Sequence, residues 1–341
     1  MRRWLWLLSL CACATVHRSL DEAALESKVR LVLTLPPIPA TRPLPFSDAA
    51  SLEAVTSPSP FEPTIEPLTA RRLERADLIQ ERWSFPSTPP VKHESSNRAV
   101  LYVYRAGELG ERPVVMMVPG FAVNDGAFSL LSRMLLTIVE QGADAIFVVP
   151  PYHLDRTAPG TASGDALLAT DATDHFTALA QGVADVRRAL QLVRSRQPPA
   201  VGAVAASMGA ASLLRAMSWD GGVDFATLIT PVVSWEDMVF ETPLMEPIRQ
   251  QLRNAGVPDD EARAMYRALD ASRARPASRV RLSIFAARYD QVAREGPLDR
   301  LIDHWRVPEP RWIERGHADA LFTPSLYKAY ARLLEDELAR R

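Results

Sequence analysis

Cysteine and lysine are both scarce in this chain of 341 residues. The two cysteines are Cys11 and Cys13, so the chain beyond them can form no internal disulfide and can use no cysteine nucleophile. Lysine occurs only as Lys28, Lys92 and Lys328, and arginine supplies the other basic residues. We interpret this skew as the codon bias of a GC-rich genome and not as a phosphate-binding surface.

The chain also lacks a surplus of charge and a pattern of metal ligands. Its formal net charge is −2, and a nucleic-acid partner usually requires a basic surplus. The six histidines and two cysteines show no zinc-finger spacing. We therefore expect no nucleic-acid partner, no metal and no cofactor. With 47% hydrophobic and 23% charged residues, the composition is that of an ordinary globular protein.

The N-terminus has the parts of a secretory signal, which we place at residues 1–14. Arg2 and Arg3 form a positive head, and the apolar run Trp4–Leu10 is far too short to cross a bilayer as a permanent helix. The letters LCAC at 10–13 resemble a bacterial lipobox, which would make Cys13 the lipidated first residue of the mature chain. The letters ACA at 12–14 also fit ordinary cleavage, and a hydrophobic start of a cytosolic protein is the third interpretation. The signal predicts an extracytoplasmic protein, secreted or periplasmic, with a lipid anchor through Cys13 on the first route.

Residues 15–97 form a proline-rich N-terminal extension. Prolines are dense from Leu35 to Pro67, and such a segment cannot hold a helix or a central strand. It therefore either tethers the domain or wraps its surface. The pattern of Leu68–Arg82 predicts a helix, and the letters RWSFPS that begin at Arg82 predict a short extended piece.

Residues 98–341 alternate between strand-like and helical patterns. Several strand-like runs are apolar without alternation, which is typical of strands covered on both faces. The predicted helices are 128–141, 174–196 and 208–218. The predicted strands lie in the runs AVLYVYRA, PVVMMVPGF, DAIFVVPPY, AVGAVAAS, FATLITPVV, VRLSIFAAR and EPRWIERG.

This alternation predicts an α/β fold, with a mostly parallel central sheet and helices on both faces, in one domain. The segment 236–277 interrupts the alternation, since it is helical and rich in charge. It is either a small cap over the edge of the sheet or a long excursion.

Ser207 sits at the seam between a predicted strand and a predicted helix, in the letters AASMGA. A strand-to-helix turn this sharp holds the serine in a strained conformation and displays its hydroxyl at the carboxyl edge of the sheet. Small residues are needed two positions before and after, and these are Ala205 and Gly209, so the motif is A-x-S-x-G where G-x-S-x-G is more common. The five residues alone are compatible with a packing corner.

A serine nucleophile needs a base and an orienting carboxylate. Among the histidines outside the signal, the proline-rich link and the predicted helices, His153 and His317 remain. His317 follows Gly316 after a predicted strand, which puts it at the same carboxyl edge. Asp290 follows another strand in the letters RYDQVA.

Two alternatives for the acid follow an earlier strand. Glu236 and Asp237 lie in the letters SWEDM, directly after the run FATLITPVV. We favour Asp290 over both.

Two backbone amides are candidates for an oxyanion hole. Met208 opens the helix that follows Ser207, so its amide points to where an oxyanion would form. Gly120 follows an early buried strand and permits a tight turn, which favours the amide of Phe121 as the second donor.

These motifs together resemble the α/β-hydrolase superfamily, over roughly residues 98–341. The serine turn, the chain order Ser–Asp–His, the letters GH before the last helix and YDxV after a late strand all match its pattern. The resemblance implies that Ser207 is the nucleophile, His317 the general base and then acid, and Asp290 the orienting acid. This sequence departs from the family pattern at Pro119, where many relatives have histidine before the glycine. The departure weakens assignment to the lipase-like branches.

The letters PYHLDR resemble the PYH-x-x-R loop of several bacterial relatives. His153 and Arg156 of this loop are candidates for substrate binding, where they would line the pocket or contact an anionic group, or they fix the loop by hydrogen bonds. In the segment 236–277, Met245, Ile248 and Leu252 either line an acyl pocket or pack a helix on the core.

The sequence thus predicts a serine hydrolase that acts on a small-molecule or lipid ester through an acyl-enzyme. Amide hydrolysis and acyl transfer use the same residues. A non-catalytic binding or scaffold lipoprotein on the same fold is the rival of a different class.

Overall fold

The computed structural model describes residues 14–34, 36–168 and 171–340, with a nine-stranded sheet at its centre. Across the sheet the order is β1-β2-β3-β5-β4-β6-β7-β8-β9. Neighbouring strands from β5 to β9 are parallel, and β1, β2, β3 and β5 pair in antiparallel fashion. The strands are β1 (Thr64–Pro67), β2 (Ile79–Pro86), β3 (Arg98–Arg105), β4 (Val114–Val118), β5 (Asp144–Val149), β6 (Val201–Ala206), β7 (Phe225–Ile229), β8 (Arg281–Ala287) and β9 (Arg311–Ile313).

The prediction of a mostly parallel sheet is confirmed, and all seven predicted strand runs contain strands. The chain passes from β4 to β5 on one side of β4 and returns to place β6 on its other side. Such a reversal of winding leaves a crevice at the carboxyl ends of the two central strands. Here those ends are followed by Gly120 and Ser207.

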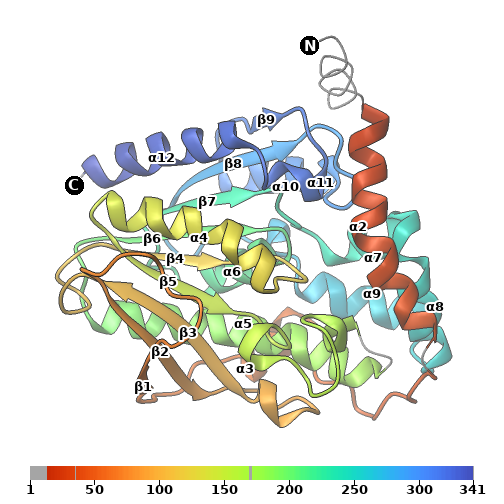
Figure 1. The fold of residues 1–341 in the computed structure, drawn as a ribbon. Coiled ribbons are helices and arrows are strands. Elements are labelled where there is room, and N and C mark those ends of the chain that lie inside the picture. The colour runs from red at the N-terminus through yellow and green to blue at the C-terminus, as the bar shows by residue number, and fades with distance from the viewer. Residues whose placement is uncertain (1–13, 35, 169–170, 341) are drawn as a thin grey trace.

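Helices cover both faces of the sheet (Figure 1). The long helices α4 and α12 pack on one face, and α5, α6 and α10 pack on the other. The described α-helices are α2 (Ala14–Thr34), α3 (Ala49–Val55), α4 (Asp125–Glu140), α5 (Ala172–Ser195), α6 (Met208–Trp219), α7 (Trp235–Glu241), α8 (Glu246–Asn254), α9 (Asp259–Ala268), α10 (Glu295–Trp305), α11 (His317–Ala320) and α12 (Pro324–Ala339), and the short 3-10 turns are η1 (Glu94–Ser96), η2 (Leu154–Arg156), η3 (Asp165–Leu168), η4 (Pro243–Met245) and η5 (Ala271–Arg273).

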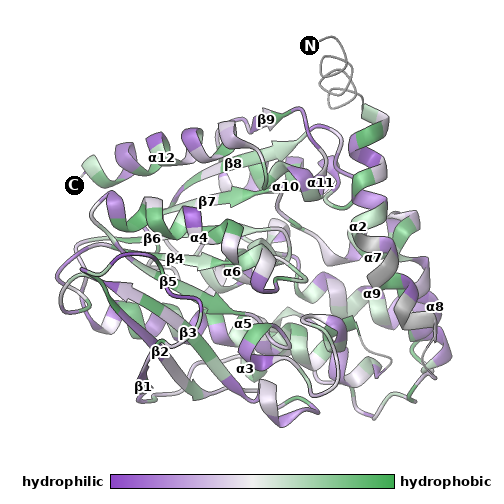
Figure 2. Cartoon of the chain, in the orientation of Figure 1, coloured by the Kyte–Doolittle hydropathy of each residue, from purple (hydrophilic) through white to green (hydrophobic). Residues whose placement is uncertain are grey.

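Alternate residues of each central strand point to opposite faces, so both faces need apolar side chains. In β4, Met116 joins the core beneath α5 and α6, and Met117 joins the core beneath α4. Every residue of β4, β5, β6 and β7 is buried. Figure 2 shows this hydrophobic centre, with the hydrophilic residues gathered on the outer helices and loops.

The sheet begins earlier in the chain than the expected boundary at Arg98. Strand β2 pairs with β3 along its whole length, and β1 extends the edge. The helix predicted for Leu68–Arg82 is therefore wrong. Its last residues belong to β2, since Trp83 and Phe85 are buried in the core that β3 and β4 share, and this packing overrides the local helical preference.

The proline-rich segment lies on the surface of the domain. Ile38 forms a bridge with Asp171, and the amide of Ala40 donates to the carbonyl of Ala255. Phe46 and Leu52 are buried in an apolar cluster with α5 and α9. The segment therefore wraps the fold, the second of its two expected arrangements. The expectation that it holds no helix is wrong, because α3 (Ala49–Val55) forms between the prolines, with Asp48 as its N-cap.

The signal predicted for residues 1–14 lies outside the described residues, apart from Ala14, which begins α2. In Figure 1, α2 stands at the edge of the molecule beside α8 and α11. Contacts with α8 and α11 fix it there. No helix in the described part of the chain is long and apolar enough to cross a membrane.

Candidate active site

Ser207 occupies a strained turn between β6 and α6. Its φ of 49° and ψ of −123° lie in a region that non-glycine residues rarely adopt. Surrounding bonds hold the turn, because the amide of Ser207 donates to Ile229 and its carbonyl accepts from Ala210 and Val232. The backbone strain is thus fixed by the neighbouring strand β7 and its loop, and the hydroxyl is displayed at the carboxyl edge of the sheet.

Two glycines make room for this turn. A Cβ on Gly209 would overlap the carbonyl oxygens of Val118 and Pro119, so α6 can approach the end of β4 only with glycine there. A Cβ on Gly120 would lie 2.9 Å from the Cβ of Ser207. Both close approaches bring the loop after β4 against the serine.

His317 and Asp290 continue from Ser207 in a hydrogen-bonded series. The Oγ of Ser207 lies 2.7 Å from Nε2 of His317, and Nδ1 of the same ring lies 2.8 Å from Oδ2 of Asp290. The other oxygen of Asp290 accepts from the amides of Val292 and Ala293, which fixes the carboxylate. The three residues come from the ends of β6, β8 and β9.

The surroundings favour the protonated imidazole of His317. Burial by itself lowers the pKa of His317, but the charge and hydrogen bond of Asp290, together with the charge of Asp21, outweigh it and raise the pKa above its usual value. An imidazole in this setting holds a proton taken from the serine more readily than one in water does.

The alternative acids are engaged elsewhere. Glu236 forms an ion pair with Arg267 at 2.6 Å, and Asp237 forms one with Arg300 at 2.7 Å. Asp290 is the one of the three candidates that contacts His317.

The loop after β4 presents Phe121 toward the serine, and Met208 is the first residue of α6. The first amides of a helix have no partner within it, so that of Met208 is open to an oxyanion. Ala122, next to Phe121, has a φ of 60° and donates its amide to Nε2 of His153 at 2.9 Å. His153 is fully buried, so it fixes the Phe121 turn and does not reach a substrate, contrary to its expected binding role.

Arg156 is also wrong as a substrate-binding residue. Its side chain is 0% exposed and pairs with Asp185 at 2.7 Å. The guanidinium donates further bonds to the carbonyls of Val149 and Ser96 and to the side chain of Gln181. These partners tie the loop after β5 to α5, so Arg156 supports the fold of the loop, the structural alternative weighed for it.

An apolar cavity of about 330 Å³ opens beside Ser207 and His317. Met245 and Ile248 of the segment 236–277 line it, whereas Leu252 packs in the adjoining core. Besides Met208 and four alanines, its apolar walls are Val29, Phe121, Val123, Leu130, Leu131, Leu168, Val232, Trp235, Met238, Met245, Ile248, Val292, Leu321 and Phe322.

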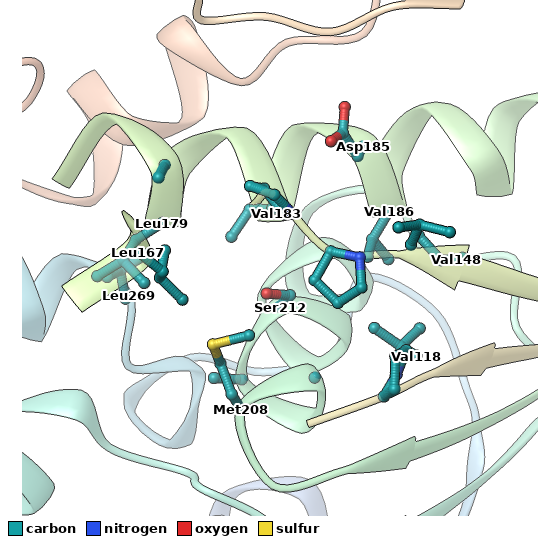
Figure 3. A pocket seen from close by; sticks show the side chains of 18 of the residues that line it. Val118, Val148, Leu167, Leu179, Val183, Asp185, Val186, Met208, Ser212 and Leu269 are labelled. Carbon is teal, nitrogen blue, oxygen red and sulfur yellow. The ribbon is translucent and has the colours of Figure 1, made fainter. Parts of the chain in front are cut away.

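A second cavity lies behind the serine turn and is shown in Figure 3. It lies between α5 and α6, and Val118, Val183 and Val186 are among its largely apolar walls. With a volume of about 20 Å³ it holds one water at most, so it cannot take a substrate. Met208 lines both cavities and stands between this space and the larger one.

Helix α2 also takes part in the site, which the sequence did not predict. Asp21 accepts hydrogen bonds from the amides of His317 and Ala318, and His17 bonds to Asp319 at 2.8 Å. The separation between Asp21 and His317 is 296 residues, and no local pattern marks such a contact.

No protein-family model matches the sequence, and no curated protein matches it either. Solved structures do match it in fold. An acetyl xylan esterase from Paenibacillus sp. R4 is 17% identical with a TM-score of 0.59, and the match covers 91% of this chain and 98% of that one. Acetyl xylan esterase 1 from Thermoanaerobacterium sp. JW/SL YS485 is 13% identical with a TM-score of 0.61 and the same coverage.

An acylaminoacyl peptidase from Pyrococcus horikoshii is 12% identical with a TM-score of 0.54, and the match covers 79% of this chain and 43% of that one. Identities this low establish the fold and leave the chemistry to be argued from the site. The order of the strands, the serine turn after β6 and these likenesses agree. The protein has the α/β-hydrolase fold.

Proposed function

We propose that this chain is a serine hydrolase that cleaves carboxylic esters. The observation that carries the proposal is the series Ser207–His317–Asp290, joined by bonds of 2.7 and 2.8 Å at the mouth of an apolar cavity. This order of nucleophile, base and orienting carboxylate is the constellation of acyl-transfer enzymes.

In the proposed reaction, Oγ of Ser207 attacks the ester carbonyl carbon while Nε2 of His317 takes the hydroxyl proton. The amides of Phe121 and Met208 hold the oxyanion of the tetrahedral intermediate. Collapse breaks the bond to the alcohol, which leaves with the proton from His317, and the acyl group stays on Ser207. His317 then deprotonates a water that attacks the acyl carbon. The bond between this carbon and Oγ breaks, Oγ takes the proton back from His317, and the acid is released.

The cavity supports a substrate with an apolar acyl group. Its walls are almost entirely apolar, and the ionisable side chains among them are Asp21, His317 and Tyr327. Its volume of about 330 Å³ lies at the lower end for pockets that hold small molecules. An acyl chain of short to medium length fits that space better than a polymer does.

Amide hydrolysis is the second candidate, since a similar fold occurs in the acylaminoacyl peptidase from Pyrococcus horikoshii. We favour esters because two of the similar structures are acetyl xylan esterases by name, with coverage of 98% of their chains. In amide hydrolysis the leaving amine must be protonated, and His317 would supply that proton as it does for the alcohol of an ester.

We further propose that the protein acts outside the cytoplasm, with Cys13 as the lipidated residue. The lipobox-like letters at 10–13 support this. The mass of the N-terminal peptide from the native host tests it: a diacylglyceryl cysteine is expected, and an intact Met1 would contradict it.

The test of the function is a panel of p-nitrophenyl esters from acetate to palmitate, with an anilide control, on the wild type and Ser207→Ala. We expect the highest kcat/KM at short to medium chains. The alanine variant should lose about four to six orders of magnitude. Ester turnover that survives this substitution contradicts the proposal, and faster cleavage of the anilide would favour an amidase.

A further inference from the structure

Asp21 on α2 bonds to both loops that carry the base and the acid. Its Oδ2 accepts from the amide of His317 at 2.8 Å and from that of Gln291 at 3.1 Å. Its Oδ1 accepts from the amide of Ala318 at 2.8 Å. Gln291 directly follows Asp290, so one carboxylate joins the loop after β8 to the loop after β9.

The carboxylate of Asp21 is buried and hydrogen-bonded as part of the folded site. The residue is 0% exposed, and each oxygen is used by at least one backbone donor. Amides that bind a charged acceptor form stronger bonds than amides that bind a carbonyl. The position of His317 relative to Asp290 therefore depends on a residue far away in the sequence.

A second anchor on the same helix contacts the same two loops. His17 stacks on Tyr289, with ring centroids 5.6 Å apart and planes 3° from parallel. Its Nδ1 bonds to Asp319 at 2.8 Å. His17 thus contacts the residue before Asp290 and the residue two positions after His317. Asp21 contacts Gln291, His317 and Ala318 of the same two loops.

We propose that Asp21 is a positioning residue of the catalytic site, which holds the His317 loop and the Asp290 loop in register so that the imidazole faces Ser207. The inference rests on the proposed function. The bonds of Asp21 go to backbone amides of the two loops and not to the side chains of Ser207, His317 or Asp290. Its helix also closes one side of the cavity through Val29, so α2 completes the active site from the N-terminal segment.

The charge of Asp21 gives it an effect on His317 that a neutral group accepting the same hydrogen bonds would not have. Asp290 faces the ring, Asp319 and Arg315 lie on its own loop, and His17 and Asp21 come from α2. The charges of Asp290 and Asp21 both raise the pKa of His317. Loss of the Asp21 charge should therefore lower the pKa of His317, whereas loss of the exposed Glu22 side chain on the same helix should not change it.

The experiment compares Asp21→Ala and Asp21→Asn with Glu22→Ala, whose side chain is exposed on the same helix. The substrate is the best p-nitrophenyl ester of the panel. The concentration of active sites is measured by labelling with a fluorophosphonate, so that kcat is calculated for folded enzyme alone. A displaced catalytic group costs up to about 100-fold. We expect Asp21→Ala to lower kcat by about 10- to 100-fold with a smaller change in KM.

Asp21→Asn keeps the shape but turns an amide group toward a backbone donor, so its kcat should lie between alanine and wild type. The acidic limb of kcat/KM should move to lower pH in both variants and stay in place in Glu22→Ala. A kcat within twofold of Glu22→Ala and an unmoved limb would overturn the inference. If Asp21→Ala does not fold, the isosteric Asp21→Asn decides by the same two readouts.

This result is separable from the proposed function. If Ser207→Ala keeps its esterase activity, the function fails regardless of Asp21. If Ser207→Ala is inactive and both Asp21 variants behave as Glu22→Ala does, only the positioning role fails.

Discussion

Replacement of Arg156 by methionine tests whether this residue stabilises the fold or binds substrate. Methionine keeps the unbranched apolar stem of the side chain but has no guanidinium and donates no hydrogen bonds. The change leaves the carboxylate of Asp185 and the carbonyls of Val149 and Ser96 without their guanidinium partner. All of these groups lie in the interior next to α5.

The expected cost follows from this burial. Arg156 is 0% and Asp185 2% exposed at the side chain, and breaking such a pair costs about 3–5 kcal/mol in free energy of unfolding. Burial raises the pKa of Asp185, and Arg156 opposes the rise. Without the arginine this pKa rises further in the folded state, so the folded state binds more protons than the unfolded one. The loss of stability should therefore be larger at pH 8 than at pH 5.

Equilibrium denaturation in urea measures the effect, with Arg279→Met as the control because Arg279 is exposed. The double variant Arg156→Met/Asp185→Leu should recover most of the loss, since an apolar pair carries no unpaired charge. In the folded fraction of Arg156→Met, KM should stay within about twofold of the wild type. Normal stability together with a raised KM for an anionic ester would refute the structural role.

Two further predictions concern the serine turn and the base. Gly209→Ala should lower the free energy of unfolding by about 1–3 kcal/mol and lower kcat, because the added Cβ overlaps the carbonyls at the end of β4. The control Gly296→Ala has open space around its Cβ and should be neutral or stabilising; thermal denaturation measures both variants. Burial lowers the pKa of His317 but Asp290 and Asp21 raise it overall, so kcat/KM should rise with pH to a midpoint above about 6.5. Asp290→Asn should shift this midpoint down and lower kcat by about 10⁴-fold, and an unchanged profile would contradict the contact between Asp290 and His317.

The sequence predicted the parts of the fold whose signal is local. The central strands are continuous apolar runs because both of their faces are covered, and this pattern needs no knowledge of the partner. Ser207 was identifiable from the small residues around it, since the close approach to β4 requires Gly209. Asp290 and His317 followed from their places after strands of a parallel sheet, whose carboxyl ends meet at one edge.

Contacts between distant segments left no such signal. The first half of strand β2, residues 79–82, continues a pattern that suggests a helix, and its pairing with β3 makes it part of the strand. The second half lies in the letters RWSFPS, which predicted an extended piece. The polar residues of the PYHLDR loop suggest exposure, but Arg156 finds its partners on α5 and near Ser87. Asp21 lies in a segment of ordinary helical composition, and its role depends on a packing that joins the two ends of the chain.

Covalent capture of Ser207 tests the central claim most directly. The wild type, Ser207→Ala and His317→Ala are treated with a fluorophosphonate, and the adduct is mapped by peptide mass spectrometry. The account predicts one adduct per folded wild-type molecule, located on Ser207, slow labelling of His317→Ala and none of Ser207→Ala. A folded wild type that stays unlabelled, or an adduct on another residue, would contradict it and favour a non-catalytic protein on this fold or a different nucleophile.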